Sequence, residues 1–269
     1  RTPALVLEKL MQYEAVHEIQ GWRDLRRRLE ADRRCFAFFH PALPDEPIIF
    51  IEVALAKGMS EQVQPLLDPD SPVVDPASAS AAIFYSITNC QEGLRGISFG
   101  NFLIKQVAED LGREFPRVKT FATLSPIPGF RKWLAETAAT HAELAELAGA
   151  LAEADWIQRA GPETSVRSEL MRLCAYYLQH AKHDNEPADA VARFHLGNGA
   201  RMERLNWLAD SSEAGMARSA GLMVNYVYRL KDVERNHEAY ANKHLVVASP
   251  GLALLARESL LARPAAKRK

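Results

Sequence analysis

The chain has 269 residues, 48% of them hydrophobic and 25% charged, so it can bury a substantial core and does not have the composition of a disordered protein. Lysine and arginine number 33 against 34 aspartates and glutamates, and the formal net charge of −1 gives no overall field for nucleic acid or an anionic membrane. No apolar run reaches the roughly 18 residues of a spanning helix, so we expect neither nucleic acid nor a membrane as a partner.

The cysteines are Cys35, Cys90 and Cys174, and they lack the spacing of metal ligands and cannot all pair with one another. They favour a reducing compartment, and we expect a cytoplasmic protein with no metal. Cys90 precedes a glycine turn and allows two interpretations, a reactive thiol or a small buried side chain. The second is favoured.

Residues 3–34 are predicted to be helical, because an apolar stripe that includes Leu7 and Leu10 recurs at helical spacing. The run of residues 23–34 is rich in arginine, but acids interleave it. This mixture favours a solvated helix face over a contact with phosphate.

Two strands are expected next, at residues 35–39 and 47–55, joined by a proline-rich turn. Glu52 in the second strand is predicted to be structural, although a buried carboxylate would need a partner. Residues 65–80 contain four prolines and three aspartates and are predicted to form a loop.

Residues 81–105 are the stretch around which the rest of the chain is arranged. An apolar run at 82–87 predicts a buried strand, three glycines up to Gly100 predict a turn, and a helix is expected to begin near Asn101. The free amides at the start of this helix, together with its dipole, would favour an anion such as a pyrophosphate.

The helix that follows has an apolar stripe in which Leu103, Val107 and Leu111 recur every four residues. Gly112 is predicted to end the helix, and Pro116 would prevent its resumption.

The glycine turn alone also fits a plain tight turn or close helix packing, and it contains neither GxGxxG nor GxxxxGK followed by Ser or Thr. Residues 95–104 do resemble the acyl-CoA pyrophosphate loop of the acetyltransferase superfamily, with Ser98 in place of its middle glycine. The residues expected to contact coenzyme A are Arg95, Gly96, Ser98, Phe99, Gly100 and Asn101.

A further strand is predicted at 118–124, leading into the proline-stiffened turn SPIPGF. Residues 131–181 are expected to be helical and are interpreted as an insertion into a sheet domain. Strands then resume within 200–209 and 221–230, joined by a short helix that Ser211 or Ser212 would cap. A last helix is predicted at 252–261.

Two residues could carry chemistry. Ser125 ends a strand, where α/β proteins often place ligands, but a plain Ser-Pro turn is the favoured interpretation from local sequence alone. His195 enters a glycine-containing loop and could transfer protons near neutral pH, although a lone histidine is more often structural. His180 and His183 with Asp184 have no convincing third metal ligand.

Several segments occur in an order and spacing that resemble those of malonyl-CoA decarboxylases: AIFYSI, GNFLIK, TLSPIPGF, MRLCAYYL, FHLGNGA, LNWLAD and GLMVNY. The resemblance implies an α+β fold with an acetyltransferase-like, mixed, mostly antiparallel sheet flanked by helices. It implies that residues 1–34 end an N-terminal helical domain and that 35–269 form the catalytic domain, with a helical insertion at about 131–190.

The same resemblance implies that Ser125 and His195 are catalytic and that Tyr228 belongs to the site. Some relatives have glutamate where this chain has Ser98, which removes any acidic role there. The implied reaction is decarboxylation of malonyl-CoA to acetyl-CoA and CO₂ through an enolate, as part of fatty acid metabolism. Neither the loss of CO₂ nor the protonation of the enolate needs a metal or an organic cofactor, so we expect none. We also expect a homo-oligomer.

Three alternatives differ from this reading. An acyl-CoA N-acyltransferase would share the fold and the loop. A thioesterase would use Ser125, His195 and Asp210, but Ser125 lacks the GxSxG elbow and Asp210 is more simply a helix-approach residue. A sensor that binds malonyl-CoA without turnover would need only the loop at 95–100.

Overall fold

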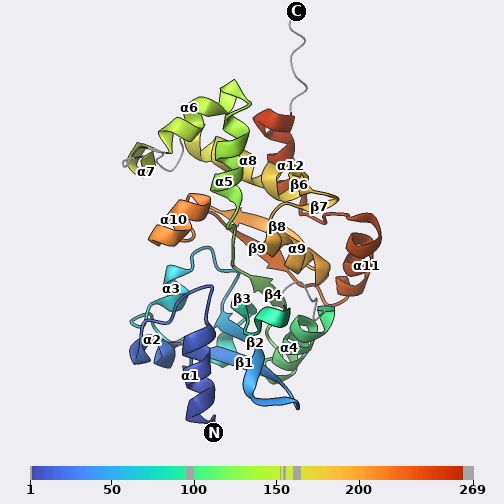
Figure 1. Cartoon of the computed structure of the whole chain (residues 1–269). Helices are drawn as coiled ribbons and strands as arrows, with labels where there is room; N and C mark the ends of the chain where they lie inside the picture. The colour runs from blue at the N-terminus through green and yellow to red at the C-terminus, as the bar shows by residue number, and fades with distance from the viewer. Residues whose placement is uncertain (1, 95–99, 152, 154–155, 160–164, 263–269) are drawn as a thin grey trace, which may run out of the picture. The chain divides into compact units, whose positions relative to one another are not determined.

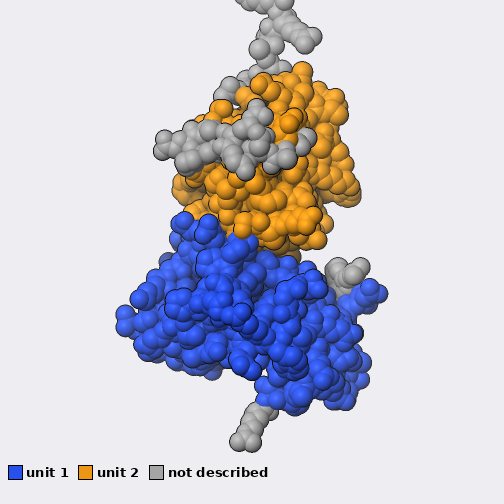
Figure 2. All heavy atoms as spheres, turned by 90° about the vertical axis from the view of Figure 1, so that its left-hand side faces the viewer, with its two compact units in different colours: residues 1–125, 227–233 blue, residues 126–226, 234–269 orange. Residues whose placement is uncertain are grey.

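The computed structural model describes residues 2–94, 100–151, 153, 156–159 and 165–262 (Figure 1). The chain divides into two compact units, coloured separately in Figure 2. The first contains Arg1–Ser125 and Val227–Val233, and the second contains Pro126–Tyr226 and Glu234–Lys269. Each unit therefore combines a long segment with a shorter one that returns from later in the sequence. The assignment of residues 1–34 to a preceding helical domain stays a prediction.

The first unit combines helices with a sheet. Its helices are α1 (Ala4–Tyr13), α2 (Trp22–Arg27), α3 (Gln64–Leu67) and α4 (Gly100–Glu114). Its strands are β1 (Arg33–His40), β2 (Leu43–Ala56), β3 (Ala81–Asn89) and β4 (Thr120–Thr123). β1 and β2 pair antiparallel, as do β2 and β3, whereas β3 and β4 are parallel. The predicted mixed, mostly antiparallel sheet is confirmed.

The stretch from β3 to β4 positions the predicted coenzyme A loop. β3 is buried over most of its length, and α4 is the crossover that its parallel pairing with β4 requires (Figure 1). The prediction that Gly112 ends α4 is wrong, because the helix continues to Glu114 and the Phe115 N–H donates to the Leu111 carbonyl at 2.8 Å. A Cβ at Gly112 would lie 3.5 Å from the Phe121 ring, so this glycine instead permits close packing.

The hairpin between β1 and β2 is tighter than predicted. β2 begins at Leu43, not at residue 47, and only Pro41 and Ala42 separate it from β1. Register shifts flank Phe39, which lies opposite Pro47. The irregular pairing accommodates a proline that has no N–H to donate to the ladder.

The prediction that the arginine-rich run is a solvated face is only partly right, because Arg23 and Arg26 are exposed whereas other arginines of the run are buried. Arg27 and Arg33 are each 4% exposed, and Asp32 is fully buried between them. Arg27 donates from Nη1 and Nη2 to the two carboxylate oxygens of Asp32, at 2.7 and 3.1 Å. Arg33 lies 2.9 Å from Asp32 Oδ2 and also donates to the Leu66 carbonyl at 2.9 Å. The interleaved acids thus pair with the arginines and allow both to be buried.

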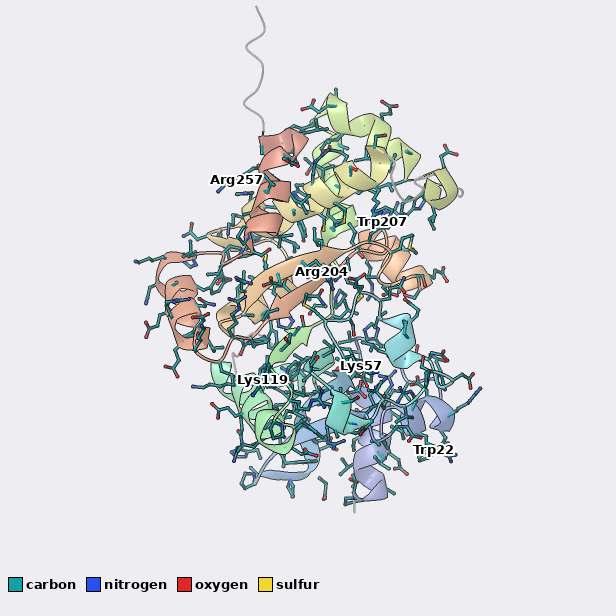
Figure 3. The ribbon with its side chains drawn as sticks, turned by 180° about the vertical axis from the view of Figure 1, so that it is seen from behind. Trp22, Lys57, Lys119, Arg204, Trp207 and Arg257 are labelled. Atoms are coloured by element: carbon teal, nitrogen blue, oxygen red, sulfur yellow. The ribbon has the colours of Figure 1, made fainter. Side chains whose placement is uncertain are left out.

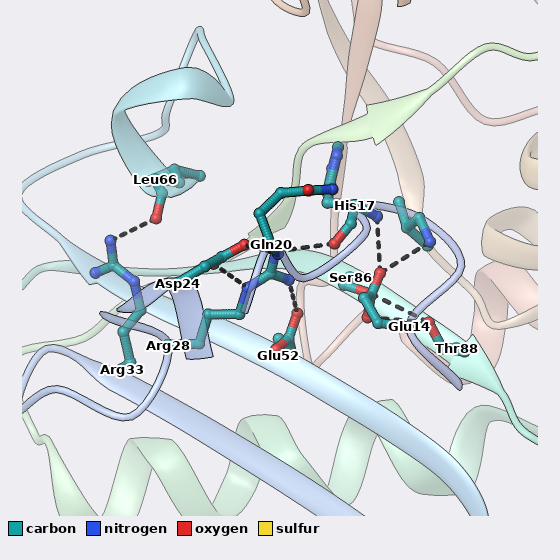
Figure 4. Close-up of polar contacts among 11 residues, drawn as sticks. Glu14, His17, Gln20, Asp24, Arg28, Arg33, Glu52, Leu66, Ser86 and Thr88 are labelled. Atoms are coloured by element: carbon teal, nitrogen blue, oxygen red, sulfur yellow. Dashed lines mark hydrogen bonds and ion pairs between the residues drawn. The ribbon is translucent and has the colours of Figure 1, made fainter. Parts of the chain in front are cut away.

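Arg28 is the centre of a second buried cluster (Figure 4). Its guanidinium donates to Asp24 Oδ1, to Glu52 Oε2 and to the His17 carbonyl, each at 2.8 Å. The expectation that Glu52 needs a buried partner is confirmed. Burial raises the pKa of Glu52 to about 7, against the opposing charge of Arg28. One side chain therefore joins α2 and the loop before it to strand β2, which lies between β1 and β3.

The second unit holds the remaining elements (Figure 1). Its helices are α5 (Phe130–Ala138), α6 (Ala142–Ala150), α7 (Trp156–Arg159), α8 (Ser165–His180), α9 (Ala190–Gly197), α10 (Glu213–Ser219), α11 (Val233–Lys243), which begins one residue before the unit, and α12 (Pro250–Glu258). Its strands are β6 (Lys182–His183), β7 (Glu186–Pro187), β8 (Arg201–Asn206) and β9 (Met223–Val227), the last residue of which belongs to the first unit. The two-residue β5 (Ser125–Pro126) has one residue in each unit. β8 pairs with β9, as the ribbon in Figure 3 shows.

Several predictions for this unit are confirmed. The described part of 131–181 is mostly helical, in α5 to α8, and the strands expected within 200–209 and 221–230 are β8 and β9. Ser212 caps α10, since its Oγ accepts from the Gly215 N–H at 3.0 Å. α12 packs against α8, and Gln179 Nε2 donates to the Leu252 carbonyl at 3.1 Å. Across the described ranges, we find no helix with the length and apolar character needed to span a bilayer.

We expect Arg28→Met to destabilise the protein by about 3–5 kcal/mol, because it leaves two buried carboxylates without their cation. The matched control is Arg23→Met, which breaks an ion pair with Asp70 whose two side chains are 72% exposed and which should cost under about 1 kcal/mol. Urea unfolding measures both. Equal effects of the two variants would contradict the structural role of Arg28, and recovery in Arg28→Met/Glu52→Gln would identify the unpaired charge as the cause.

Candidate active site

The predicted coenzyme A loop is only partly within the described residues. Arg95, Gly96, Ser98 and Phe99 lie outside them. Gly100 and Asn101 form the first turn of α4, so the helix begins where the sequence predicts. The N-terminus of α4 thus comes after β3 in the chain, and its free backbone amides could bind an anion there. The contacts with the phosphates of coenzyme A stay a prediction.

Ser125 lies just beyond β4, at the first residue of β5, and is 5% exposed. Its Oγ donates to Thr123 Oγ1 at 2.8 Å, and Thr123 is fully buried. Two residues apart on an extended chain, these side chains point to the same face. Thr123 thus fixes the direction of the Ser125 hydroxyl, and sequence reasoning missed this partner.

Tyr228 follows β9 and lies in the same unit as Ser125. Its N–H donates to the Phe121 carbonyl at 2.8 Å, and its ring packs edge-on against Phe84 with the centroids 6.3 Å apart. The residue is 2% exposed, and burial raises the pKa of its phenol well above the usual range. Tyr228 is therefore a neutral phenol that can donate a hydrogen bond.

His195 occupies the last turn of α9, so the prediction that it enters a loop is wrong by one turn. The helix is capped by Asp189, whose side chain accepts from the Ala192 N–H at 2.9 Å. The glycines that suggested a loop begin only as the helix ends, at Gly197. His195 is consequently held on a regular element, which restricts its position more than a loop would.

The imidazole of His195 is buried among aromatic rings. It stacks on Tyr226 with ring centroids 4.4 Å apart and an interplanar angle of 26°, and Phe194 meets it edge-on at 5.1 Å. The residue is 4% exposed, and burial lowers the pKa of its imidazole from 6.5 to about 3. His195 is therefore neutral at physiological pH. The alternation along GLMVNYVY, in which Tyr226 and Tyr228 are two residues apart, could have pointed to Tyr226.

Ser125 and Tyr228 belong to the first unit and His195 to the second. Each is buried and held by its own neighbours. A hydrogen bond between Ser125 and His195 stays a prediction.

Other candidate residues have simpler roles. Cys35, Cys90 and Cys174 are free thiols, and the favoured interpretation of Cys90 as a buried side chain is confirmed, since it is 7% exposed. Burial raises the pKa of its thiol to about 12. Asp210 Oδ1 accepts from the Ser212 N–H at 3.0 Å and so forms the approach to α10, as predicted. No group of three or more His, Cys, Asp or Glu side chains in the described part of the chain could hold a metal ion.

The family model for the malonyl-CoA decarboxylase C-terminal domain matches residues 1–266. The mitochondrial malonyl-CoA decarboxylase of Anser anser anser is 38% identical over 284 residues, and the match covers 96% of this chain and 56% of the goose protein. The crystal structure of malonyl-CoA decarboxylase from Agrobacterium vitis is 49% identical with a TM-score of 0.88, covering 95% of this chain and 65% of that one. The chain thus spans about half the length of the goose relative.

A more distant structure extends the likeness of the fold. GphF, a GNAT-like decarboxylase solved in complex with isobutyryl-CoA, is 17% identical with a TM-score of 0.52, and the match covers 84% of this chain and 96% of that one. At this identity the likeness concerns the fold alone. The predicted α+β, acetyltransferase-like fold is confirmed.

The depressed pKa of His195 predicts a pH dependence of stability. The unfolded chain binds a proton at His195 below about pH 6.5 and the folded chain does not, so the contribution is present above that pH and is lost as the pH falls toward 3. The stability difference between wild type and His195→Asn should fall by about 1.4 kcal/mol per pH unit below about pH 6. Urea titrations at several pH values test this, with the exposed His183→Asn as control. A difference that does not change with pH would contradict the neutral, buried imidazole.

Proposed function

Because the chain belongs to the malonyl-CoA decarboxylase family, we propose that it converts malonyl-CoA to acetyl-CoA and CO₂. The observation that carries the proposal is the match of the C-terminal domain model to residues 1–266, a range that contains Ser125, His195 and Tyr228. The burial of all three side chains supports it, since a water-poor site strengthens the hydrogen bonds that such chemistry uses.

The proposed reaction breaks the bond between the carboxylate and the α-carbon of the malonyl group. The electron pair of that bond moves into the thioester, which becomes an enolate, and CO₂ leaves. The α-carbon then takes one proton to give acetyl-CoA. The thioester carbonyl itself accepts the electrons, so we propose a reaction without an added cofactor. The enzyme must stabilise the enolate oxygen and deliver the proton, and one oriented donor to such an oxygen is worth roughly 3–4 kcal/mol in other enzymes.

We assign the proton-carrying role to His195. A neutral imidazole can release a proton from one nitrogen while it receives one at the other, so it needs no stable imidazolium in a buried place. The Ser125 hydroxyl donates its proton to Thr123 Oγ1, and we propose that Ser125 acts as a pair with His195, as the family resemblance implies. A serine bonded in this way is not activated as a nucleophile, and we propose that no acyl-enzyme forms.

Tyr228 and the start of α4 complete the proposed site. The raised phenol pKa keeps Tyr228 protonated, so it can donate to the substrate. The N-terminus of α4, with Arg95 and the residues to Asn101, would hold the pyrophosphate of coenzyme A.

Malonyl-CoA is a building unit of fatty acids, and the free cysteines suit a reducing compartment. We therefore propose that this protein is a cytoplasmic enzyme of fatty acid metabolism and that it acts as a homo-oligomer.

The main alternative is an acyl-CoA N-acyltransferase, favoured by the GNAT-like fold. A sensor that binds malonyl-CoA without turnover is the second. Incubation with malonyl-CoA alone distinguishes decarboxylation, and also thioester hydrolysis, from these two alternatives. Acetyl-CoA with CO₂ supports decarboxylation, free coenzyme A with malonate supports hydrolysis, and unchanged ligand supports a sensor or a transferase that lacks its acceptor.

In this assay we expect His195→Asn to lower kcat by something on the order of 10² to 10⁴ and to leave KM nearly unchanged, the effect of a lost general acid or base. His183→Asn is the matched control, because that side chain is 85% exposed, and it should retain wild-type turnover. Melting temperatures measured on the same preparations separate a catalytic loss from unfolding. Near-wild-type turnover in a stable His195→Asn protein would remove His195 from the mechanism.

A further inference from the structure

The turn that follows His195 is tied to the histidine by backbone hydrogen bonds. The His195 carbonyl accepts from the Asn198 N–H at 3.2 Å and from the Ala200 N–H at 3.0 Å. Asn198 also donates from its side chain to the Phe194 carbonyl at 2.7 Å. Gly199 adopts φ +78°, which lets the chain reverse into β8. A displacement of this turn would therefore displace the backbone of His195.

Two consecutive residues of α11 hold the turn from outside. His237 donates from Nδ1 to the Gly197 carbonyl at 2.7 Å. Asn236, which is 7% exposed, donates from Nδ2 to the Gly199 carbonyl at 3.2 Å. A Cβ at Gly197 would lie 3.8 Å from the Tyr240 ring, so α11 also packs closely against the turn. The contacts join segments about 40 residues apart in sequence.

We propose that Asn236 and His237 are positioning residues for decarboxylation: they fix the turn at Gly197 and Gly199 and through it the place of the His195 imidazole. This inference rests on the proposed function. The stack on Tyr226 restrains the plane of the imidazole, and the turn restrains its backbone. Proton transfer needs the donor within hydrogen-bond reach, and a displacement of about 1 Å can cost roughly 10²-fold in rate.

The chemistry of the two contacts selects the test variants. The Gly197 carbonyl can only accept, so the imidazole of His237 carries a proton on Nδ1 in this contact. Asparagine places its amide nitrogen near the position of Nδ1, whereas leucine keeps bulk and removes the donor. His237→Leu should therefore break the contact and His237→Asn should keep it.

We expect His237→Leu to lower kcat roughly 10- to 100-fold with KM for malonyl-CoA unchanged, and His237→Asn to stay within about threefold of wild type. Glu238→Gln, on the exposed face of the same helix, is the control and should behave as wild type. Asn236→Asp replaces the second donor by an acceptor of the same shape and gives an independent reading should His237→Leu fail to fold. If His237 only stabilised the fold, His237→Leu would lower the melting temperature but would not lower kcat, and His237→Asn would have no kcat to restore.

Combination with His195→Asn decides whether the effect passes through His195. We expect His237→Leu to cause no further loss of kcat in that background. Normal turnover of His237→Leu, or a loss that persists in the His195→Asn background, would overturn the positioning role and leave the proposed function intact. Wild-type turnover of His195→Asn would instead refute the catalytic assignment of His195, and the positioning role with it.

Discussion

The burial of the His195 imidazole is the constraint on which the proposed chemistry depends. A charged imidazolium at a residue that is 4% exposed would lose most of its hydration, and the pKa falls to about 3 as a result. In the mechanism that we propose, the ring therefore acts as a neutral relay, which both accepts and donates a proton, and not as a cationic acid. A relay of this kind works only where its position is fixed, and the last turn of α9, the Tyr226 ring and α11 together provide that rigidity.

The first unit also buries titratable side chains, but there they are stabilised by ion pairs and not by aromatic rings. Arg28 is 1% exposed and Glu52 is 1% exposed, and each would be costly alone. Because the guanidinium has donors in a fixed fork, it donates to Asp24, to one carboxylate oxygen of Glu52 and to the His17 carbonyl at once (Figure 4). The cluster connects the N-terminal helices to β2, the neighbour of β3. The strand that leads to the predicted coenzyme A loop therefore lies beside a strand fixed by buried ion pairs.

Much of this arrangement could be predicted from local sequence, because strong periodicity and glycine placement determine the stretch from β3 through α4. The burial of Arg28 could not be predicted in this way. A charged side chain is buried only where partners from distant segments surround it, and no local sequence pattern shows those partners. Gly112 was misjudged for a similar reason: whether a glycine ends a helix or permits close packing depends on what lies across from it, here Phe121. The helical placement of His195 was hidden by the glycines just beyond it, and Tyr226 was missed because an alternating strand residue looks like ordinary core.

The protonation state of His195 is the quantity that tests this account most directly. ¹⁵N NMR of protein labelled at histidine, with His195→Asn used to assign the resonance, reports the charge of each ring through its nitrogen shifts. The account predicts that the His195 nitrogens keep the shifts of a neutral ring between about pH 8 and pH 5. A titration of that resonance with a midpoint near the usual value of 6.5 would show that the ring is charged at the pH of the reaction and would contradict the neutral relay.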